Sequence, residues 1–203
     1  NFMFKELDDY DILDVRNKVV LDVGAFVGET AIFFALKGAN KVVAVEASPW
    51  AYQMAKRNVE INGLSNIITL VNCAISKDDG RILMLPTYET TPGFNTRNII
   101  YGNTPVPTCT LDTIIEKYGP FDILKMDCEG CEYDSILYSE KLGEFKEILI
   151  EYHEGYEPIL MKLLNAKFNI IKYSAQLIGG KLYDQPIDPK LGYIYAAKSI
   201  IKN

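Results

Sequence analysis

The hydrophobic pattern of the chain changes period repeatedly, from short β-branched runs to longer segments with helical spacing. The runs are typical of buried strands, and they are predicted at residues 18–23, 41–45, 66–71, 121–126, 147–152 and 168–173. Helices are predicted between them, at residues 29–36, 49–62, 111–118, 133–138 and 157–166. Strands that alternate with helices indicate a doubly wound α/β fold, in which a mostly parallel sheet has helices on both faces.

Two further segments, 80–86 and 106–110, are predicted to be extended, and a loop rich in Thr, Pro, Asn and Gly separates them. A late strand is predicted at 191–198, reached through short extended pieces and a loop with Pro and Gly. No repeat or compositional boundary divides the chain. We therefore expect a single domain over 1–203, with 1–17 as an N-terminal lead-in and 87–105 as a substrate-loop insertion.

The composition narrows the class of protein. The chain has 203 residues, 48% hydrophobic and 24% charged, which is enough to build one well-packed core. Its net charge of −6 argues against an extended nucleic-acid-binding surface. No apolar stretch is long enough to span a membrane, and the acidic N-terminal residues do not resemble a signal peptide. We expect a cytoplasmic protein. The oligomeric state is left open, with a homo-oligomer in which a partner subunit covers the pocket as one alternative.

Cys128 and Cys131 form a C-x-x-C pair. This spacing occurs in redox motifs and in zinc sites. A zinc site usually needs a second close pair, which Cys73 and Cys109 do not provide. We therefore predict packing cysteines that flank an acidic turn, with a disulfide as the less favoured alternative.

The first strand ends in VVLDVGAFVGET, an acid followed by a glycine turn. A dinucleotide-binding turn would read G-x-G-x-x-G. When Gly24 is aligned with the second glycine, Asp22 takes the first position and Gly28 falls one residue late. A carboxylate at that position would repel a pyrophosphate. The turn suits a ligand that has a cationic amino group and no phosphate.

A second acid, Glu46, ends the next strand, where a carboxylate can accept both hydroxyls of a ribose. Either acid alone could be a solvated strand end or a helix cap. Together, at the ends of consecutive strands, they indicate a cationic amino acid joined to an unphosphorylated ribose and adenine. The predicted cofactor is S-adenosylmethionine.

Five segments extend this pattern: VVLDVGAFVGET, VVAVEASPWAYQMAKRNVEING, VNCAIS, CTLDTI and DILKMDCEGCEYDSIL. In this order they resemble the FkbM family of S-adenosylmethionine-dependent methyltransferases, over roughly residues 18–173. The resemblance implies a Rossmann-like, seven-stranded methyltransferase sheet with an antiparallel last strand. It also implies O-methylation of hydroxyls on small molecules or sugars.

The resemblance further implies which residues lie at the cofactor. They are Asp22, Gly24 and Gly28 around its methionine end, Glu46 at the ribose, Ala47 beside the adenine, and Asn72 and Cys73 at the adenine edge. Asn72 departs from the acid that many methyltransferases have there, although its amide oxygen can still accept a bond from the adenine amino group. Phe26 departs from the usual Asn of the turn.

Methyl transfer to a hydroxyl is an in-line displacement in which the acceptor also loses a proton. Asp127 ends the fourth strand, and Glu151 and His153 end the fifth, where alternation puts them on the same face. We predict that His153, the only histidine, accepts the proton and that Glu151 or Asp127 orients it. A divalent ion held by these three residues is the alternative. No metal is assigned, because the spacing does not demand one.

The predicted function is therefore methylation of a small hydroxylated molecule. Residues 19–62 also resemble enzymes that methylate a guanine of transfer RNA, which usually carry two prolines after the fourth strand. Here Asp127 is followed by Cys128-Glu129-Gly130 instead. A binding module for S-adenosylmethionine without activity is the third hypothesis.

Overall fold

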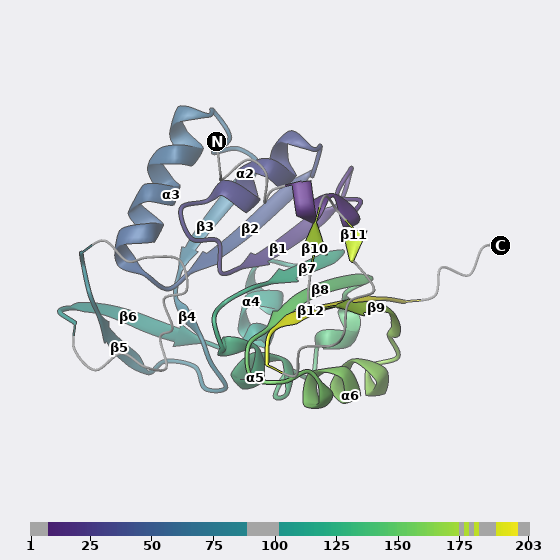
Figure 1. Cartoon of the computed structure of the whole chain (residues 1–203). Helices are drawn as coiled ribbons and strands as arrows, with labels where there is room; N and C mark the ends of the chain where they lie inside the picture. The colour runs from purple at the N-terminus through teal and green to yellow at the C-terminus, as the bar shows by residue number, and fades with distance from the viewer. Residues whose placement is uncertain (1–7, 89–101, 175–176, 179–180, 183–189, 199–203) are drawn as a thin grey trace.

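The computed structural model describes residues 8–88, 102–174, 177–178, 181–182 and 190–198 (Figure 1). The middle of the predicted substrate loop and the first residues of the lead-in lie outside this range.

A seven-stranded sheet forms the centre of the molecule, in the order β3-β2-β1-β7-β8-β12-β9. Its strands are β3 (Ile68–Asn72), β2 (Lys41–Glu46), β1 (Val19–Val23), β7 (Ile123–Met126), β8 (Glu147–Tyr152), β12 (Gly192–Ala197) and β9 (Asn169–Ser174). The pairs from β3 to β8 are parallel, whereas β12 is antiparallel to both β8 and β9. The predicted mostly parallel sheet with an antiparallel last strand is confirmed.

The strand order reverses beside β1, which has β2 on one side and β7 on the other. Chain connections leave in opposite directions at such a point, so the carboxyl ends of the strands there border a ligand site. The parallel register places Asp22 of β1 opposite Ala44 of β2 and Lys125 of β7. The residues that follow these strands therefore meet at one edge of the sheet.

Helices cover both faces of the sheet (Figure 1). On one face lie α2 (Glu29–Leu36) and α3 (Pro49–Ile61), and on the other α4 (Leu111–Tyr118), α5 (Cys131–Ile136) and α6 (Glu157–Asn165). Side-chain caps define two helix starts. Ser48 Oγ accepts a hydrogen bond from Ala51 N at 3.3 Å, and Thr110 Oγ1 accepts one from Thr113 N at 3.1 Å.

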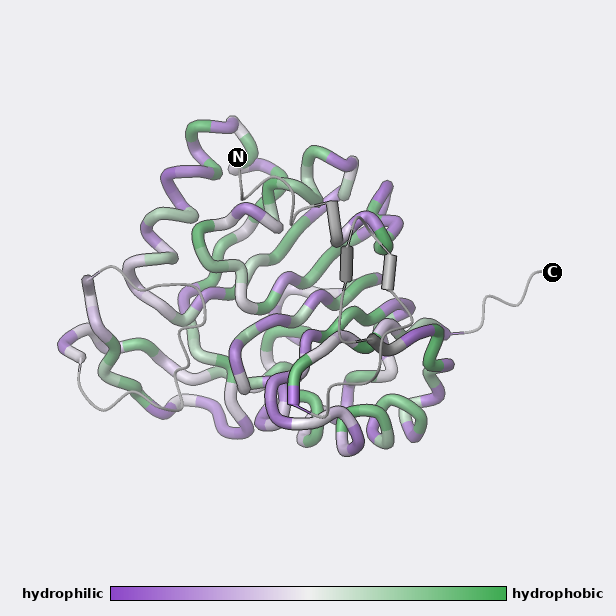
Figure 2. The backbone as a smooth tube through the Cα atoms, in the orientation of Figure 1, coloured by the Kyte–Doolittle hydropathy of each residue, from purple (hydrophilic) through white to green (hydrophobic). Residues whose placement is uncertain are grey.

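The core consists of two apolar layers, one on each side of the sheet. Val43 and Val45 of β2 belong to the layer under α4, α5 and α6, while Val42 and Ala44 belong to the layer under α2 and α3. Hydrophobic residues accordingly fill the central strands in Figure 2. A strand that is covered on both faces needs a continuous apolar run, which explains the sequence pattern that predicted it.

Smaller elements surround the main sheet. A second sheet has the order β4-β6-β5, with β4 (Ala74–Ile75), β6 (Thr104–Cys109) and β5 (Ile82–Leu85). The remaining elements are η1 (Asp8–Ile12), η3 (Leu142–Glu144), and the paired strands β10 (Leu177–Ile178) and β11 (Lys181–Leu182). The periodicity did not predict β4, η1 or η3. Within the described residues, every helix is too short or too polar to serve as a membrane span.

Candidate active site

The glycine turn between β1 and α2 is held tightly against neighbouring strands. Gly24 and Gly28 have φ values of +79° and +88°, a region that glycine adopts at little cost. A Cβ added at Gly24 would lie 1.6 Å from the carbonyl oxygen of Asp127. Gly24 N and Ala25 N both donate to Val45 O, at 3.0 and 3.1 Å. The turn thus joins the carboxyl ends of β2 and β7, and only glycine fits at position 24.

Asp22 braces this turn from inside the protein. Its side chain is fully buried, its Oδ2 accepts a hydrogen bond from Thr30 Oγ1 at 2.5 Å, and its Oδ1 lies 3.1 Å from Lys125 Nζ. Lys125 also donates to Gly24 O at 3.1 Å. Burial acts to lower the pKa of Lys125, but the charge and hydrogen bond of Asp22, together with the charges of Tyr10 and Asp127, outweigh it and raise the pKa, so the lysine stays charged. These contacts favour a supporting role for Asp22 rather than direct contact with a ligand.

Glu46 connects the glycine turn to the start of α3. Its carboxylate accepts hydrogen bonds from Phe26 N at 2.9 Å and Ser48 N at 2.7 Å. Burial raises the pKa of Glu46 to about 7, although the two backbone hydrogen bonds act to lower it. An acid that titrates near neutrality lies where the sequence predicted a ribose-binding carboxylate.

Asn72 continues the same edge of the sheet at the end of β3. Its Nδ2 donates to the carbonyl oxygens of Glu46 and Ala47, at 2.8 and 3.1 Å. The amide oxygen is therefore the part of the side chain that can accept a bond from a ligand. Cys73 beside it is buried, and its thiol is hydrogen-bonded to that of Cys109. The structure thus brings the residues predicted at the ribose and adenine to one edge of the sheet.

The predicted catalytic residues also come together. Asp127, Glu151 and His153 each offer one side-chain atom within 4.8 Å of the others. Burial, together with the charge and the hydrogen bond of the Asp127 carboxyl, raises the pKa of Glu151 to about 8. A hydrogen bond between two carboxyl groups needs a proton between them, so this pair holds one proton and one negative charge.

His153 is held between two other acids. Its Nδ1 lies 3.1 Å from Glu132 Oε1, and its Nε2 lies 3.3 Å from Glu129 Oε2. Burial acts to lower the pKa of His153, but these carboxylates raise it to about 9. An imidazole that is protonated at neutral pH cannot accept another proton. The contacts therefore favour an electrostatic role for His153 over the predicted role as proton acceptor.

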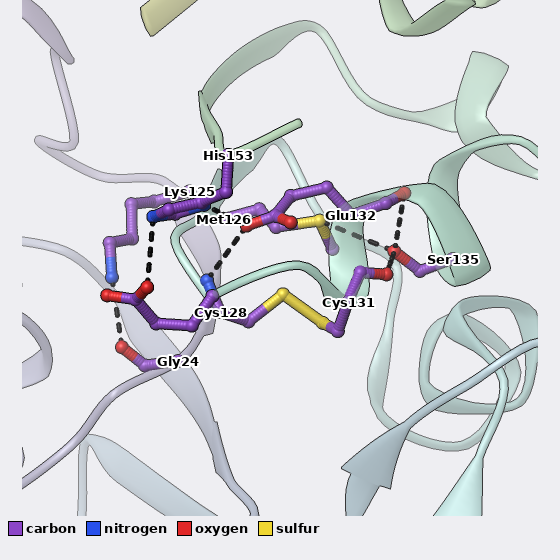
Figure 3. The surroundings of a disulfide bond; sticks show 9 residues. Gly24, Lys125, Met126, Cys128, Cys131, Glu132, Ser135 and His153 are labelled. Atoms are coloured by element: carbon purple, nitrogen blue, oxygen red, sulfur yellow. Dashed lines mark hydrogen bonds and ion pairs between the residues drawn. A yellow bond between two sulfur atoms is a disulfide. The ribbon is translucent and has the colours of Figure 1, made fainter. Parts of the chain in front are cut away.

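Cys128 and Cys131 form a disulfide, with their Cα atoms 5.5 Å apart (Figure 3). The prediction of free packing cysteines was wrong. Glu129 and Gly130 both have positive φ, 57° and 106°, so the chain curls back and brings the two cysteines within bonding distance. Cys128 N also donates to Glu132 Oε1 at 3.2 Å. The disulfide-bridged turn at residues 128–131 thus connects Asp127 to Glu132, the acid that contacts His153.

Three residues of the site were missed by the sequence analysis. Lys125 left a signal, because a charged residue inside a predicted buried strand requires a partner. Glu132 left a weaker one, as an acid at the start of a short helix. Tyr10 of η1 left none. Its ring centroid lies 5.5 Å from Lys125 Nζ and 6.0 Å from the ring of Phe34, contacts that link distant parts of the chain.

The fold and this edge of the sheet define the class of protein. Three features are typical of an S-adenosylmethionine-dependent methyltransferase. They are a parallel sheet in which one strand next to the edge, β12, is antiparallel, a glycine turn after β1, and an acid at the end of β2. Residues 22–170 match the methyltransferase FkbM domain. The chain belongs to the FkbM methyltransferase family, as its motifs predicted, and the cofactor of this class is S-adenosylmethionine.

Curated relatives share parts of this domain. Protein arginine N-methyltransferase 1 of Oryza sativa subsp. indica is 48% identical over 56 residues, which are 28% of this chain and 14% of that protein. An uncharacterized protein, 158B, of Sulfolobus islandicus rod-shaped virus 1 is 26% identical over 148 residues, 73% of this chain and 68% of that protein. The first of the curated relatives are matched over no more than 28% of their own length.

Solved structures confirm the fold. A ribosomal protein L11 methylase from Lactobacillus delbrueckii subsp. bulgaricus superimposes with a TM-score of 0.57 and 16% identity, covering 98% of this chain and 80% of that one. TrmK of M. capricolum, in complex with S-adenosyl-homocysteine, superimposes with a TM-score of 0.59 and 12% identity. The match covers 95% of this chain and 67% of that one. At these identities the likeness concerns the fold and not the acceptor.

Proposed function

We propose that this protein transfers a methyl group from S-adenosylmethionine to a hydroxyl of a small molecule or sugar. The observation that carries the proposal is the position of Asp127, Glu151 and His153. They converge at the carboxyl ends of β7 and β8, and the backbone of Asp127 contacts the glycine turn at Gly24. Groups that can take up a proton thus lie beside the proposed binding site for the reactive end of the cofactor.

The residues of the proposed cofactor site fit such a ligand. The turn from Gly24 to Gly28 surrounds the methionine end, and Asp22 and Lys125 keep the turn in shape. Glu46 accepts the ribose hydroxyls, since its carboxylate oxygens lie at the end of β2 with backbone donors that hold their orientation. The adenine lies beside Ala47 and Cys73, with its amino group donating to the Asn72 amide oxygen.

In this proposal the bound cofactor supplies an electrophilic methyl group. Asp127 and Glu151 take the proton that the acceptor hydroxyl loses, because both ring nitrogens of His153 are already engaged, Nδ1 with Glu132 and Nε2 with Glu129. The imidazolium of His153 keeps the neighbouring carboxylates in position and offsets part of their charge. The main contribution of the protein is alignment of the hydroxyl with the methyl group and exclusion of water.

The acceptor class can be tested with labelled S-adenosylmethionine and three pools of acceptors: hydroxylated small molecules, proteins and transfer RNA. We expect label in the small molecules, on a methyl ether that survives mild base, and much less transfer by Asp127→Asn. Exposed Glu154→Gln is the matched control and should keep wild-type transfer. Label found only in protein or RNA would contradict the proposal.

The ionisation of Glu46 leads to a second prediction, which concerns how the affinity for S-adenosylmethionine depends on pH. Its ionised form accepts both ribose hydroxyls, and its pKa is about 7. Protonation below this pH removes acceptor capacity, so the affinity for S-adenosylmethionine should fall by up to about tenfold per pH unit as the pH drops below 7. Titration calorimetry between pH 5 and 8 would measure this effect. Glu46→Gln, which cannot ionise, should bind weakly with a flatter profile; parallel profiles in both proteins would contradict the role of Glu46.

A further inference from the structure

We propose that Asp127, Glu151 and His153 bind a divalent transition-metal ion, with Glu132 fixing the orientation of the histidine. The proposal deepens the proposed function and rests on it for a role in catalysis. Metal binding itself can be measured without methyl transfer.

The three side chains offer a compact set of donors. One carboxylate oxygen from Asp127, one from Glu151 and one ring nitrogen of His153 lie within 4.8 Å of one another, and each residue is half-buried. A bound ion would draw these atoms closer together. The donors come from the ends of two adjacent parallel strands, β7 and β8, whose pairing holds them at a constant separation. Rigid strands are the part of a fold that presents ligands to a metal most accurately.

Glu132 is an independent observation that points to a ligand. Its side chain is fully buried, and its Oε2 has no hydrogen-bond partner among the described residues. Its Oε1 lies 3.1 Å from His153 Nδ1 (Figure 3). Histidines that bind a metal through one ring nitrogen usually donate the other N–H to a carboxylate, which fixes the tautomer. Glu132 is placed for this role, and because it occupies Nδ1, it leaves Nε2 as the ring nitrogen that can bind an ion.

The charge and the donor types indicate the kind of ion. Four acids, Asp127, Glu129, Glu132 and Glu151, surround a single histidine, so a divalent cation would relieve their mutual repulsion. Glu129 Oε2 lies 3.3 Å from His153 Nε2, and a bound ion would replace both this contact and the proton on Nε2, which is released to solvent. Two carboxylates with one imidazole favour Mn²⁺ or Zn²⁺ over Ca²⁺ and Mg²⁺, which prefer oxygen ligands alone. Such an ion would hold an acceptor hydroxyl beside the methyl group.

The test uses the full chain without a histidine tag and Mn²⁺ as the probe. Loss of the free Mn²⁺ signal in electron paramagnetic resonance should show one bound ion per chain. Glu132→Gln should weaken binding by about 10- to 100-fold, and Glu151→Gln and His153→Gln should weaken it further. Glu154→Gln removes an exposed charge next to His153 and should bind Mn²⁺ as the wild type does.

A second measurement needs no variant. His153 is the only histidine in the chain, so its ring protons give a single resolved set of NMR signals. Stoichiometric Mn²⁺ should broaden these signals. Sharp histidine signals with Mn²⁺ present, or equal Mn²⁺ affinity in all the variants, would overturn the proposal. The two carboxyl groups of Asp127 and Glu151 would then be held together by a shared proton instead of an ion. If S-adenosylmethionine binds but Mn²⁺ does not, the metal site fails while the proposed function stands.

Discussion

Gly24→Ala is expected to weaken S-adenosylmethionine binding by at least about 100-fold. The added Cβ would lie 1.6 Å from the Asp127 carbonyl oxygen, and φ at this residue is +79°. Relief of this contact requires the turn to move away from the end of β7, which would displace the methionine end of the pocket. The same change should lower the midpoint of thermal unfolding. Titration calorimetry and a thermal melt would measure the two effects.

Gly63→Ala provides the matched control. Gly63 has a similar φ of +68°, but an added Cβ would meet nothing within 4 Å. Its substitution should therefore cost only the strain of a left-handed alanine, about 1–2 kcal/mol, and leave cofactor affinity unchanged. Comparable affinity in the two variants would mean that the turn at Gly24 is not part of the cofactor site.

Lys125→Met is expected to lower the free energy of unfolding by about 3–5 kcal/mol. Lys125 is 2% exposed and Asp22 is fully buried, and their charged atoms lie 3.1 Å apart. Methionine fills the same space but leaves a buried carboxylate without its cation, and the hydrogen bond from Thr30 compensates only part of that loss. Urea denaturation followed by circular dichroism would measure the change.

An exposed ion pair separates the effect of burial from that of charge. Lys146 Nζ lies 2.6 Å from Asp122 Oδ1, yet the lysine side chain is 65% exposed. Lys146→Met should cost no more than about 1 kcal/mol. The double variant Asp22→Asn with Lys125→Met should lose less stability than the sum of the two single changes, because no unpaired charge remains. An additive result would show that the two residues do not stabilise each other.

Periodicity predicted the main sheet and its helices well, because strands buried on both faces must be continuously apolar. The helices at 29–36 and 111–118 and the strand at 147–152 have the predicted bounds. The first helical residue of α5 is Cys131 instead of the predicted Tyr133, since Gly130 at φ 106° lets the helix begin directly after the bridged turn. The short strand β4 escaped prediction because two residues cannot display a period.

The candidate site was predictable as a set of positions but not as a set of roles. Acids at strand ends locate Glu46, Asp127 and Glu151, since topology alone brings those ends together. The role of Asp22 depends on Lys125, a partner that only the strand register places beside it. The charge of His153 likewise depends on carboxylates from a neighbouring turn. Long-range contacts of this kind leave no local pattern in a sequence.

The central claim is that the edge formed by β1, β2 and β3 binds S-adenosylmethionine. Titration calorimetry of the purified chain with S-adenosylmethionine tests it most directly, with NAD as the control ligand and Glu46→Ala as the control protein. The account predicts one bound S-adenosylmethionine per chain, no binding of NAD, and a clear loss of affinity in Glu46→Ala. Preference for NAD, or equal affinity for S-adenosylmethionine in both proteins, would contradict it.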